Sequence, residues 1–146
     1  MSASASNASF RRPQRGAAMV EFALIASIFL MLALGVMEFG RWMFTLNAAS
    51  EATRWGARLA AICDVNDAVI KEKMRSILSG VDDTQISISY APANCSAASC
   101  RTVEVKLVNV YFTPLLPFMG IEIPVPPFTT TLTRELMNSA GNPACS

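Results

Sequence analysis

Histidine is absent from this chain of 146 residues. The absence removes a common metal ligand and the commonest general base, so it argues against a metal centre and a nucleophilic active site. Strong positive charge is lacking too: twelve basic and eleven acidic residues give a formal net charge of +1. No basic cluster is interleaved with aromatic residues, which argues against nucleic-acid binding. We therefore expect no catalytic residue, cofactor, metal ion, nucleic acid or small-molecule substrate.

What the chain does have is a long apolar run. Residues 17–37 contain a single charged side chain, Glu21. A helix of this length spans about 31 Å, roughly the thickness of a bilayer core. Residues 1–16 carry three arginines and no acid, so the positive-inside rule places them in the cytoplasm and residues 38–146 outside. A cleaved secretory signal peptide is the alternative, but its apolar core usually has only about 7–15 residues.

Glu21 lies where an ordinary membrane anchor carries nothing polar. A carboxylate within an apolar helix costs about 2.5–3.5 kcal/mol, so it usually has a partner. One interpretation is that Glu21 extends toward the headgroups at the nearby membrane edge. The other is that cleavage after Gly16 creates a new ammonium group on Ala17, which pairs with Glu21 of a neighbouring subunit. Electrostatics alone does not choose between the two.

Several segments resemble a known family. Residues 16–22, GAAMVEF, resemble the processing site of type IV prepilin-like proteins. The longer segment 11–44, RRPQRGAAMVEFALIASIFLMLALGVMEFGRWMF, is similar to the TadE-like pseudopilins of Tad (tight adherence, Flp-type) pilus systems. Residues 47–61, 103–120 and 128–135 resemble later parts of the same family, although with less specific motifs.

The resemblance implies a processing site and an assembly role. A prepilin peptidase would cleave after Gly16, leaving Ala17 as the first residue, Glu21 at mature position five and Phe22 next to it. Glu21 and Ala17 would form the charge pair of the assembly. The product would reside in the bacterial inner membrane or in a surface pilus, with other pilins, pseudopilins and Tad assembly proteins as partners. It would act in pilus assembly, adhesion or secretion and have no enzymatic activity. The alternative is an uncleaved single-pass membrane protein whose external domain binds a partner.

The patterns after the apolar run predict an α+β fold. The helix continues to residue 62, and a second helix follows over 67–79, with Asn66 as its N-cap and Gly80 as its stop. Alternation with a period of two indicates strands over 84–90, 102–112 and 128–136, which form a three-stranded antiparallel sheet. The apolar residues 107–112 should be its most buried part. The organisation is therefore a basic leader, 1–16, a membrane helix with its extension, 17–62, and a small external head, 63–146.

Two segments leave alternatives open. Small residues are frequent over 48–61, so this helical face packs either on its own sheet or on a neighbouring subunit's helix. Residues 113–127 hold five of the eight prolines, which excludes regular structure. The apolar residues of this loop either fold back on the core or form an exposed patch that meets a neighbour. They are Leu115, Leu116, Phe118, Met119 and Ile121.

Four cysteines fit an oxidising compartment. Cys95 and Cys100 lie at the ends of the loop between the first two expected strands, in position to close it. That leaves Cys63, at the end of the long helix, and Cys145, in the C-terminal tail. The preferred connectivity is Cys95–Cys100 with Cys63–Cys145, one of three possible pairings. The scattered spacing disfavours a zinc site.

Overall fold

The computed structural model describes residues 15–115, 120–135 and 137–145, so the basic leader lies almost entirely outside the described residues. The chain forms two compact units, Met1–Met37 and Glu38–Ser146. Helix α1, Arg15–Ile62, contributes to both. In the first unit its large apolar side chains are exposed all round, with Met31 at 75%. Among the described residues this helix is the only one long and apolar enough to cross a membrane.

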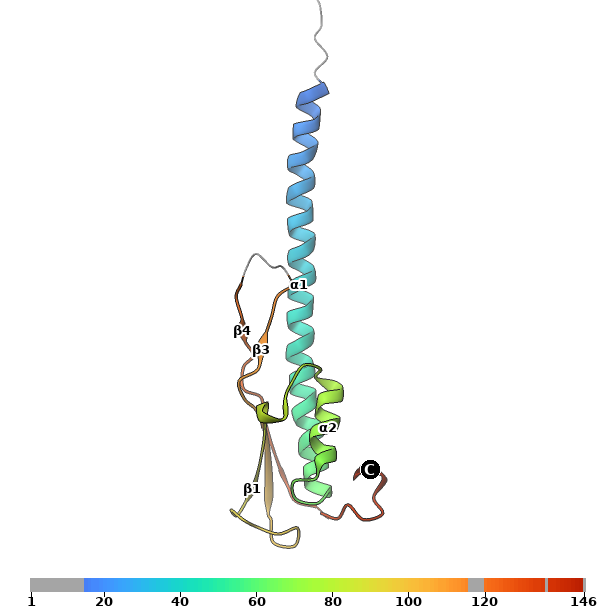
Figure 1. Cartoon of the computed structure of the whole chain (residues 1–146), viewed down its shortest axis with the longest axis vertical. Coiled ribbons are helices and arrows are strands. Elements are labelled where there is room, and N and C mark those ends of the chain that lie inside the picture. The colour runs from blue at the N-terminus through green and yellow to red at the C-terminus, as the bar shows by residue number, and fades with distance from the viewer. Residues whose placement is uncertain (1–14, 116–119, 136, 146) are drawn as a thin grey trace, which may run out of the picture. The chain divides into compact units, whose positions relative to one another are not determined.

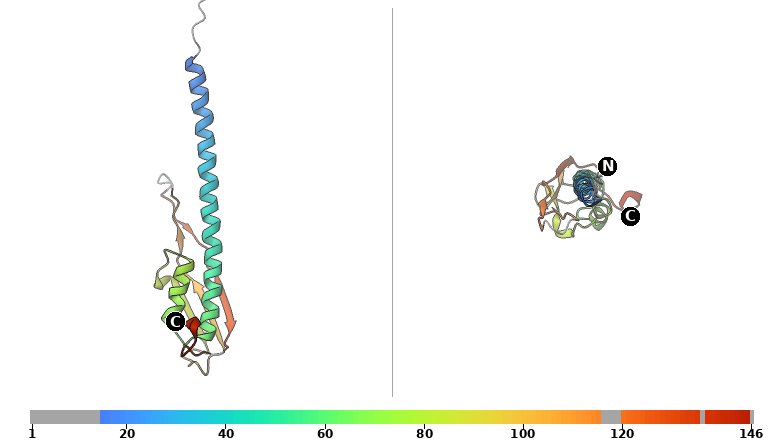
Figure 2. Two further views of the ribbon diagram at one scale, coloured as in Figure 1. Left: turned by 90° about the vertical axis from the view of Figure 1, so that its right-hand side faces the viewer. Right: turned by 90° about the horizontal axis from the view of Figure 1, so that it is seen from above.

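The second unit joins the second half of α1 to the α+β fold that the sequence predicts for the head. Figures 1 and 2 show its second helix and its strands beside the C-terminal half of α1. The head contains α2 (Ala68–Ile77), β1 (Ile86–Ala91), β2 (Thr102–Leu107), β3 (Tyr111–Phe112), β4 (Ile123–Pro124), β5 (Thr129–Thr133) and the short 3-10 helices Asp83–Gln85 and Pro143–Cys145. Strands β1, β2 and β5 form an antiparallel sheet in the order β1-β2-β5. Strands β3 and β4 form a separate antiparallel pair.

The small-residue face of α1 packs into the head's own core. Its alanines at 49, 52, 57 and 60 are fully buried. They belong to one cluster with the inward side chains of β2, among them Val103 and Val105, and with Ile70 and Met74 of α2. Small side chains allow close approach, and at Gly56 an added Cβ would collide with the Met74 thioether. The first of the two sequence-based alternatives therefore holds for this face.

The predicted start and end of the second helix need correction. Asp67, not Asn66, is the N-cap of α2, and its side chain accepts a hydrogen bond from the Val69 N–H group. Asn66 instead adopts the left-handed conformation, with φ of 61°. Asn66 belongs to the turn before α2, so the helix begins one residue later than the predicted cap implies. The helix ends at Ile77, and Gly80, with φ of +86°, lies in the turn that follows.

The second predicted strand was too long. It ends at Leu107 because Asn109 adopts a left-handed conformation, with φ of 54°, that interrupts the extended chain. Tyr111 and Phe112 then form β3, outside the main sheet. The expectation that 107–112 is the most buried part was wrong, since Tyr111 is 52% exposed. The first strand begins two residues later than expected because Asp83–Gln85 forms a 3-10 turn.

The proline-rich segment 113–127 contains regular structure after all. Ile123 pairs with Phe112, and Pro124 pairs with Tyr111, in a short ladder of strands β3 and β4. Within the segment Leu115 and Ile121 are exposed, so these two side chains belong to the exposed-patch alternative. Leu116, Phe118 and Met119 lie outside the described residues, as does Leu136 at the end of the third predicted strand.

Candidate assembly site

The expected processing segment lies at the beginning of α1. Gly16 to Phe22 are helical, and the Gly16–Ala17 peptide bond belongs to the first turn. The first four N–H groups of a helix lack intrahelical acceptors, so this turn is the easiest part of the helix to open. A Cβ on Gly16 would meet nothing within 4 Å. The packing of this chain therefore does not require glycine at position 16.

Glu21 lies on an apolar, exposed stretch of helix. Its neighbours Val20 and Phe22 are 63% and 71% exposed. Ala17 is one helical turn before Glu21, so the two residues lie on the same face. By contrast, the hydroxyl group of Ser27 in the same unit donates a hydrogen bond to the Leu24 carbonyl at 2.8 Å. Among the side chains that the structure describes, none forms a hydrogen bond or an ion pair with Glu21. Both interpretations of Glu21 remain predictions.

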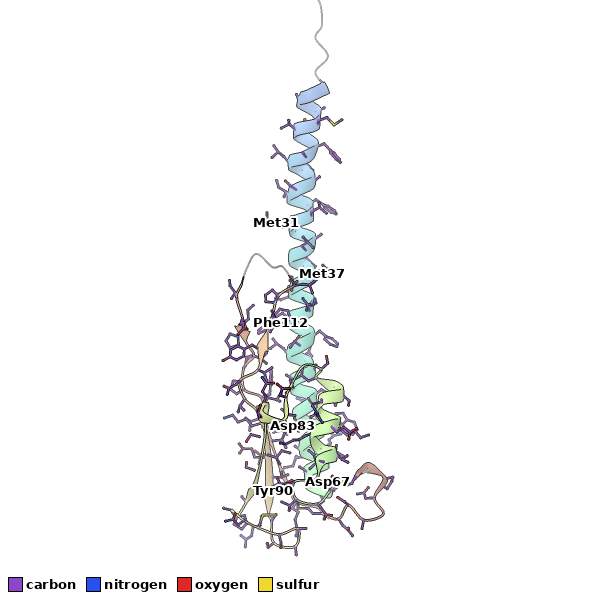
Figure 3. All side chains as sticks on the ribbon, viewed as in Figure 1. Met31, Met37, Asp67, Asp83, Tyr90 and Phe112 are labelled. Atoms are coloured by element: carbon purple, nitrogen blue, oxygen red, sulfur yellow. A yellow bond between two sulfur atoms is a disulfide. The ribbon has the colours of Figure 1, made fainter. Side chains whose placement is uncertain are left out.

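A second polar site, which we call the Glu38 junction, consists of Glu38, Arg41, Trp42, Phe112 and Leu115. The Arg41 guanidinium donates to both carboxylate oxygens of Glu38, at 3.0 and 3.2 Å. The Leu115 backbone N–H donates to the same carboxylate at 2.9 Å. The ring of Phe112 (Figure 3) lies 5.3 Å from the Arg41 guanidinium and meets Trp42 edge-on, with ring centroids 5.3 Å apart. The junction ties the start of segment 113–127 to α1.

Sequence reasoning missed most of this junction. The spacing of Glu38 and Arg41, three residues apart on a helix, is a usable signal for their ion pair. No sequence signal connects Glu38 with Leu115, which is 77 residues away. Arg41 and Trp42 fit the sequence pattern of a membrane boundary, and the structure adds that both contact Phe112.

The C-terminal tail closes the opposite end of the head. The Glu135 N–H donates to the Ala61 carbonyl at 3.1 Å, and the Asn138 N–H donates to the Ile62 carbonyl at 2.9 Å. The last C=O groups of a helix have no N–H donor within the helix. The tail supplies donors to two such groups at the end of α1. The end of α1 is therefore stabilised by backbone groups that lie more than seventy residues later in the chain.

Ser139 links the tail to the start of α2. Its hydroxyl oxygen accepts from the Asp64 N–H at 2.9 Å, and its hydroxyl donates to an Asp67 carboxylate oxygen at 2.5 Å. The hydrogen bonds from the Ser139 hydroxyl and then from the Val69 N–H lower the pKa of Asp67 below its ordinary value. The ionised carboxylate is thus the form that holds the tail and the helix together.

Tyr90 of β1 lies at the same end of the head as Asp67 (Figure 3). Its phenolic oxygen accepts a hydrogen bond from the Asn66 N–H at 3.2 Å. Burial is the largest effect and raises the pKa of Tyr90; the hydrogen bond from the Asn66 N–H opposes it, and the negative charge of Asp67 adds to it. The phenol therefore remains neutral and serves as a structural acceptor for the turn before α2.

The cysteines are paired as the sequence favoured. Cys63 is bonded to Cys145, and Cys95 is bonded to Cys100. The first bond fastens the tail to the end of α1, while the second closes the loop between β1 and β2. Over the ranges 15–115, 120–135 and 137–145, no group of three or more potential metal-ligating side chains comes together.

Comparison with known proteins gives one family. No curated protein and no solved structure matches the chain. Residues 16–58 match the family model for TadE-like protein, which agrees with the resemblance noted from the sequence. TadE-like proteins are pilus components that are not known as enzymes. The match begins at Gly16, includes Glu21 and follows α1 into the head. Residues 16–58, which include the apolar run 17–37 of the candidate membrane helix, are therefore similar to TadE-like protein.

Proposed function

We propose that this protein is a minor pilin or pseudopilin of a Tad (Flp-type) pilus, and that a prepilin peptidase cleaves it after Gly16. It takes part in pilus assembly, adhesion or secretion rather than in catalysis. The observation that carries the proposal is the combination at the start of α1. The apolar run 17–37 of a TadE-like segment presents an exposed surface, and Glu21, the one carboxylate of that run, lacks a partner among the described side chains.

The proposed assembly step is a charge pairing between subunits. Cleavage leaves an ammonium group on Ala17, which pairs with Glu21 of a neighbouring subunit. Each charge is costly in apolar surroundings, so pairing offsets part of the cost of both. Because the ammonium of one helix reaches the carboxylate of the next at only one axial offset, the pair also sets the stagger of the packed helices. The exposed apolar side chains of residues 17–37 then pack against other helices instead of lipid.

We further propose a single-pass topology in the bacterial inner membrane. The basic residues of the leader remain in the cytoplasm, and the head lies outside. The two disulfide bonds support this placement because such bonds persist in oxidising compartments.

The processing claim is tested by the intact mass of the protein from its native membrane. We expect a mature chain that starts at Ala17 in cells with the prepilin peptidase, and a longer chain in cells without it. A Met1 or Ser2 start in peptidase-competent cells would contradict the claim and favour the uncleaved, partner-binding alternative. Gly16→Leu is the matched variant: a side chain at position 16 meets nothing in the fold, so loss of cleavage in this variant reports on recognition by the peptidase.

The charge pairing is tested with Glu21→Ala. Removal of the carboxylate should leave membrane insertion intact, since the span becomes more apolar, but should abolish incorporation into pili. Ser27→Ala is the control from the same span, because Ser27 is hydrogen-bonded within its own helix, and it should assemble like the wild type. Sheared-pilus fractions and membrane fractions are compared by immunoblot. Normal piliation by Glu21→Ala would count against the pairing.

A further inference from the structure

The Glu38 junction fixes one end of segment 113–127 at the residue that directly follows the apolar span. Met37 is the last residue of the span, and Glu38 is the next in the chain. The Glu38 carboxylate holds the Leu115 N–H at 2.9 Å. Because a span of residues 17–37 matches the bilayer core in length, Glu38 belongs to the boundary between core and headgroups. Leu115 shares that boundary.

The direction of the chain supports this placement. Phe112 contacts Arg41 and Trp42, whereas Leu115 is bound to Glu38. Three residues along a helix correspond to about 4.5 Å, so the chain runs from the level of Arg41 toward Glu38, the first residue of the second unit, as it leaves β3. Strand β4 runs antiparallel to β3, with Ile123 opposite Phe112. Residues 120–122 therefore lie at the same end of the strand pair as residues 113–115. Figure 1 shows this strand pair beside α1.

The side chains on this edge are apolar and exposed. Leu115 is 68% exposed, Ile121 is 55% exposed and Ile123 is 37% exposed. Among the described residues 120–127, Glu122 carries the only charge. An apolar edge of this kind calls for a covering surface. Because the edge is bound at Leu115 to Glu38, the residue that follows the span in the chain, the bilayer is the surface that fits.

The surrounding residues are those that favour a membrane interface. Trp42 and Arg41 lie in the junction, and Tyr111 of β3 is 52% exposed. Tyrosine and tryptophan are enriched at headgroup level, where an apolar body and a polar tip are both accommodated. The acidic Glu122 is exposed on the same edge. Its charge favours a zwitterionic over an anionic lipid surface.

We propose that Leu115 and Ile121 insert into the lipid interface at the level of Glu38, and we call them, with Ile123, the interfacial edge. The head is then held to the bilayer by a second contact in addition to α1. This inference requires that the span lie in a membrane, but neither cleavage after Gly16 nor assembly into a pilus. It also assigns a use to an exposed patch that would otherwise meet a neighbouring protein.

The test is photocrosslinking of the full chain in vesicles of dioleoylphosphatidylcholine. The photoreactive residue p-benzoylphenylalanine replaces Leu115, Ile121 or, as a control, the exposed Thr131 of β5. Mass spectrometry should find lipid adducts at positions 115 and 121 in several-fold higher yield than at position 131. Equal yields at the three positions would overturn the proposal, as would crosslinks at 115 and 121 that join mainly a second copy of the chain.

A second measurement uses the depth of a fluorescent side chain. Ile121→Trp and Thr131→Trp are reconstituted in vesicles that contain brominated lipid, and the emission of the parent protein is subtracted. Both positions are exposed, so the fold should tolerate either change, and peptide mapping of the two disulfides verifies it. Strong quenching is expected for Ile121→Trp alone. Quenching no greater than that of Thr131→Trp would overturn the interfacial edge.

Discussion

At the scale of single residues, Asp67 shows how one carboxylate joins distant parts of the chain. It accepts a hydrogen bond from the N–H group of Val69 and another from the hydroxyl of Ser139. The first caps α2, and the second attaches the C-terminal tail. Because both donors favour the ionised form, the stability of the head should depend on the charge of Asp67.

The sign of that dependence follows from the direction of the shift. The pKa of Asp67 is lower in the folded chain than its ordinary value, which is near 4. Its contribution to stability is therefore present above that ordinary value and is lost as the pH falls through the lower, folded-state pKa. Asp67→Ala should lower the free energy of unfolding by about 1 kcal/mol at neutral pH, the usual cost of losing an N-cap.

Asp67→Asn is the matched control, since asparagine caps helices well but does not ionise in this range. It should retain most of the stability at neutral pH and show a smaller loss at acidic pH. Urea unfolding of the full chain in detergent, at neutral and at acidic pH, measures both effects. An unchanged acid-induced loss in Asp67→Asn would show that other groups cause it.

At the scale of elements, α1 and α2 are in close contact at Gly56. A Cβ there would collide with Met74, which is 1% exposed and has little room to move. Gly56→Val should therefore destabilise the head by about 1–3 kcal/mol, the usual cost of overpacking a core. The free energy of unfolding in urea gives the value.

Gly40→Val in the same helix is the control for the change of residue type. A Cβ at Gly40 meets nothing within 4 Å, so the free energy of unfolding should change by less than about 0.5 kcal/mol. Equal losses for the two variants would mean that the contact with Met74 is not the cause of the destabilisation. The sequence shows a run of small residues here, but only the folded chain reveals which of them the second helix touches.

At the scale of the whole molecule, the two disulfide bonds have unequal weight. Cys63–Cys145 spans 82 residues of the sequence, whereas Cys95–Cys100 spans 5. In the chain-entropy model, removal of the long link costs about 4.5 kcal/mol, and removal of the short link costs about 2 kcal/mol. Small domains have a total stability of about 5–15 kcal/mol, so loss of the long link threatens the fold.

Two double variants measure the difference. Cys63→Ser with Cys145→Ser should unfold at a clearly lower urea concentration than Cys95→Ser with Cys100→Ser. The first pair should also release the tail from α1, which faster proteolysis after Glu135 would report. The reverse order of stability would contradict the claim that the disulfide of the C-terminal tail contributes more to the stability of the head.

Local patterns in the sequence account for much of this architecture. Three such patterns are the apolar run, the alternation in β1 and in the first half of β2, and the small residues of α1. Each consists of residues that are close together in the sequence. Helix and strand periods are properties of contiguous residues, so they predict the α+β fold without knowledge of distant contacts. Gly16 and Glu21 are likewise recognised from a contiguous motif, which the TadE-like match covers.

Only the tertiary structure decides the features that depend on where the chain returns. The end of β2 at Leu107, the β3–β4 pair and the hydrogen bond between Glu38 and Leu115 all join segments that a linear pattern treats as unrelated. The same is true of the tail that caps α1. Free energy in these contacts comes from burial and from satisfied backbone groups, which exist only after the chain has folded. The motif around Glu21 is thus written in the sequence, whereas the edge beside Glu38 exists only in three dimensions.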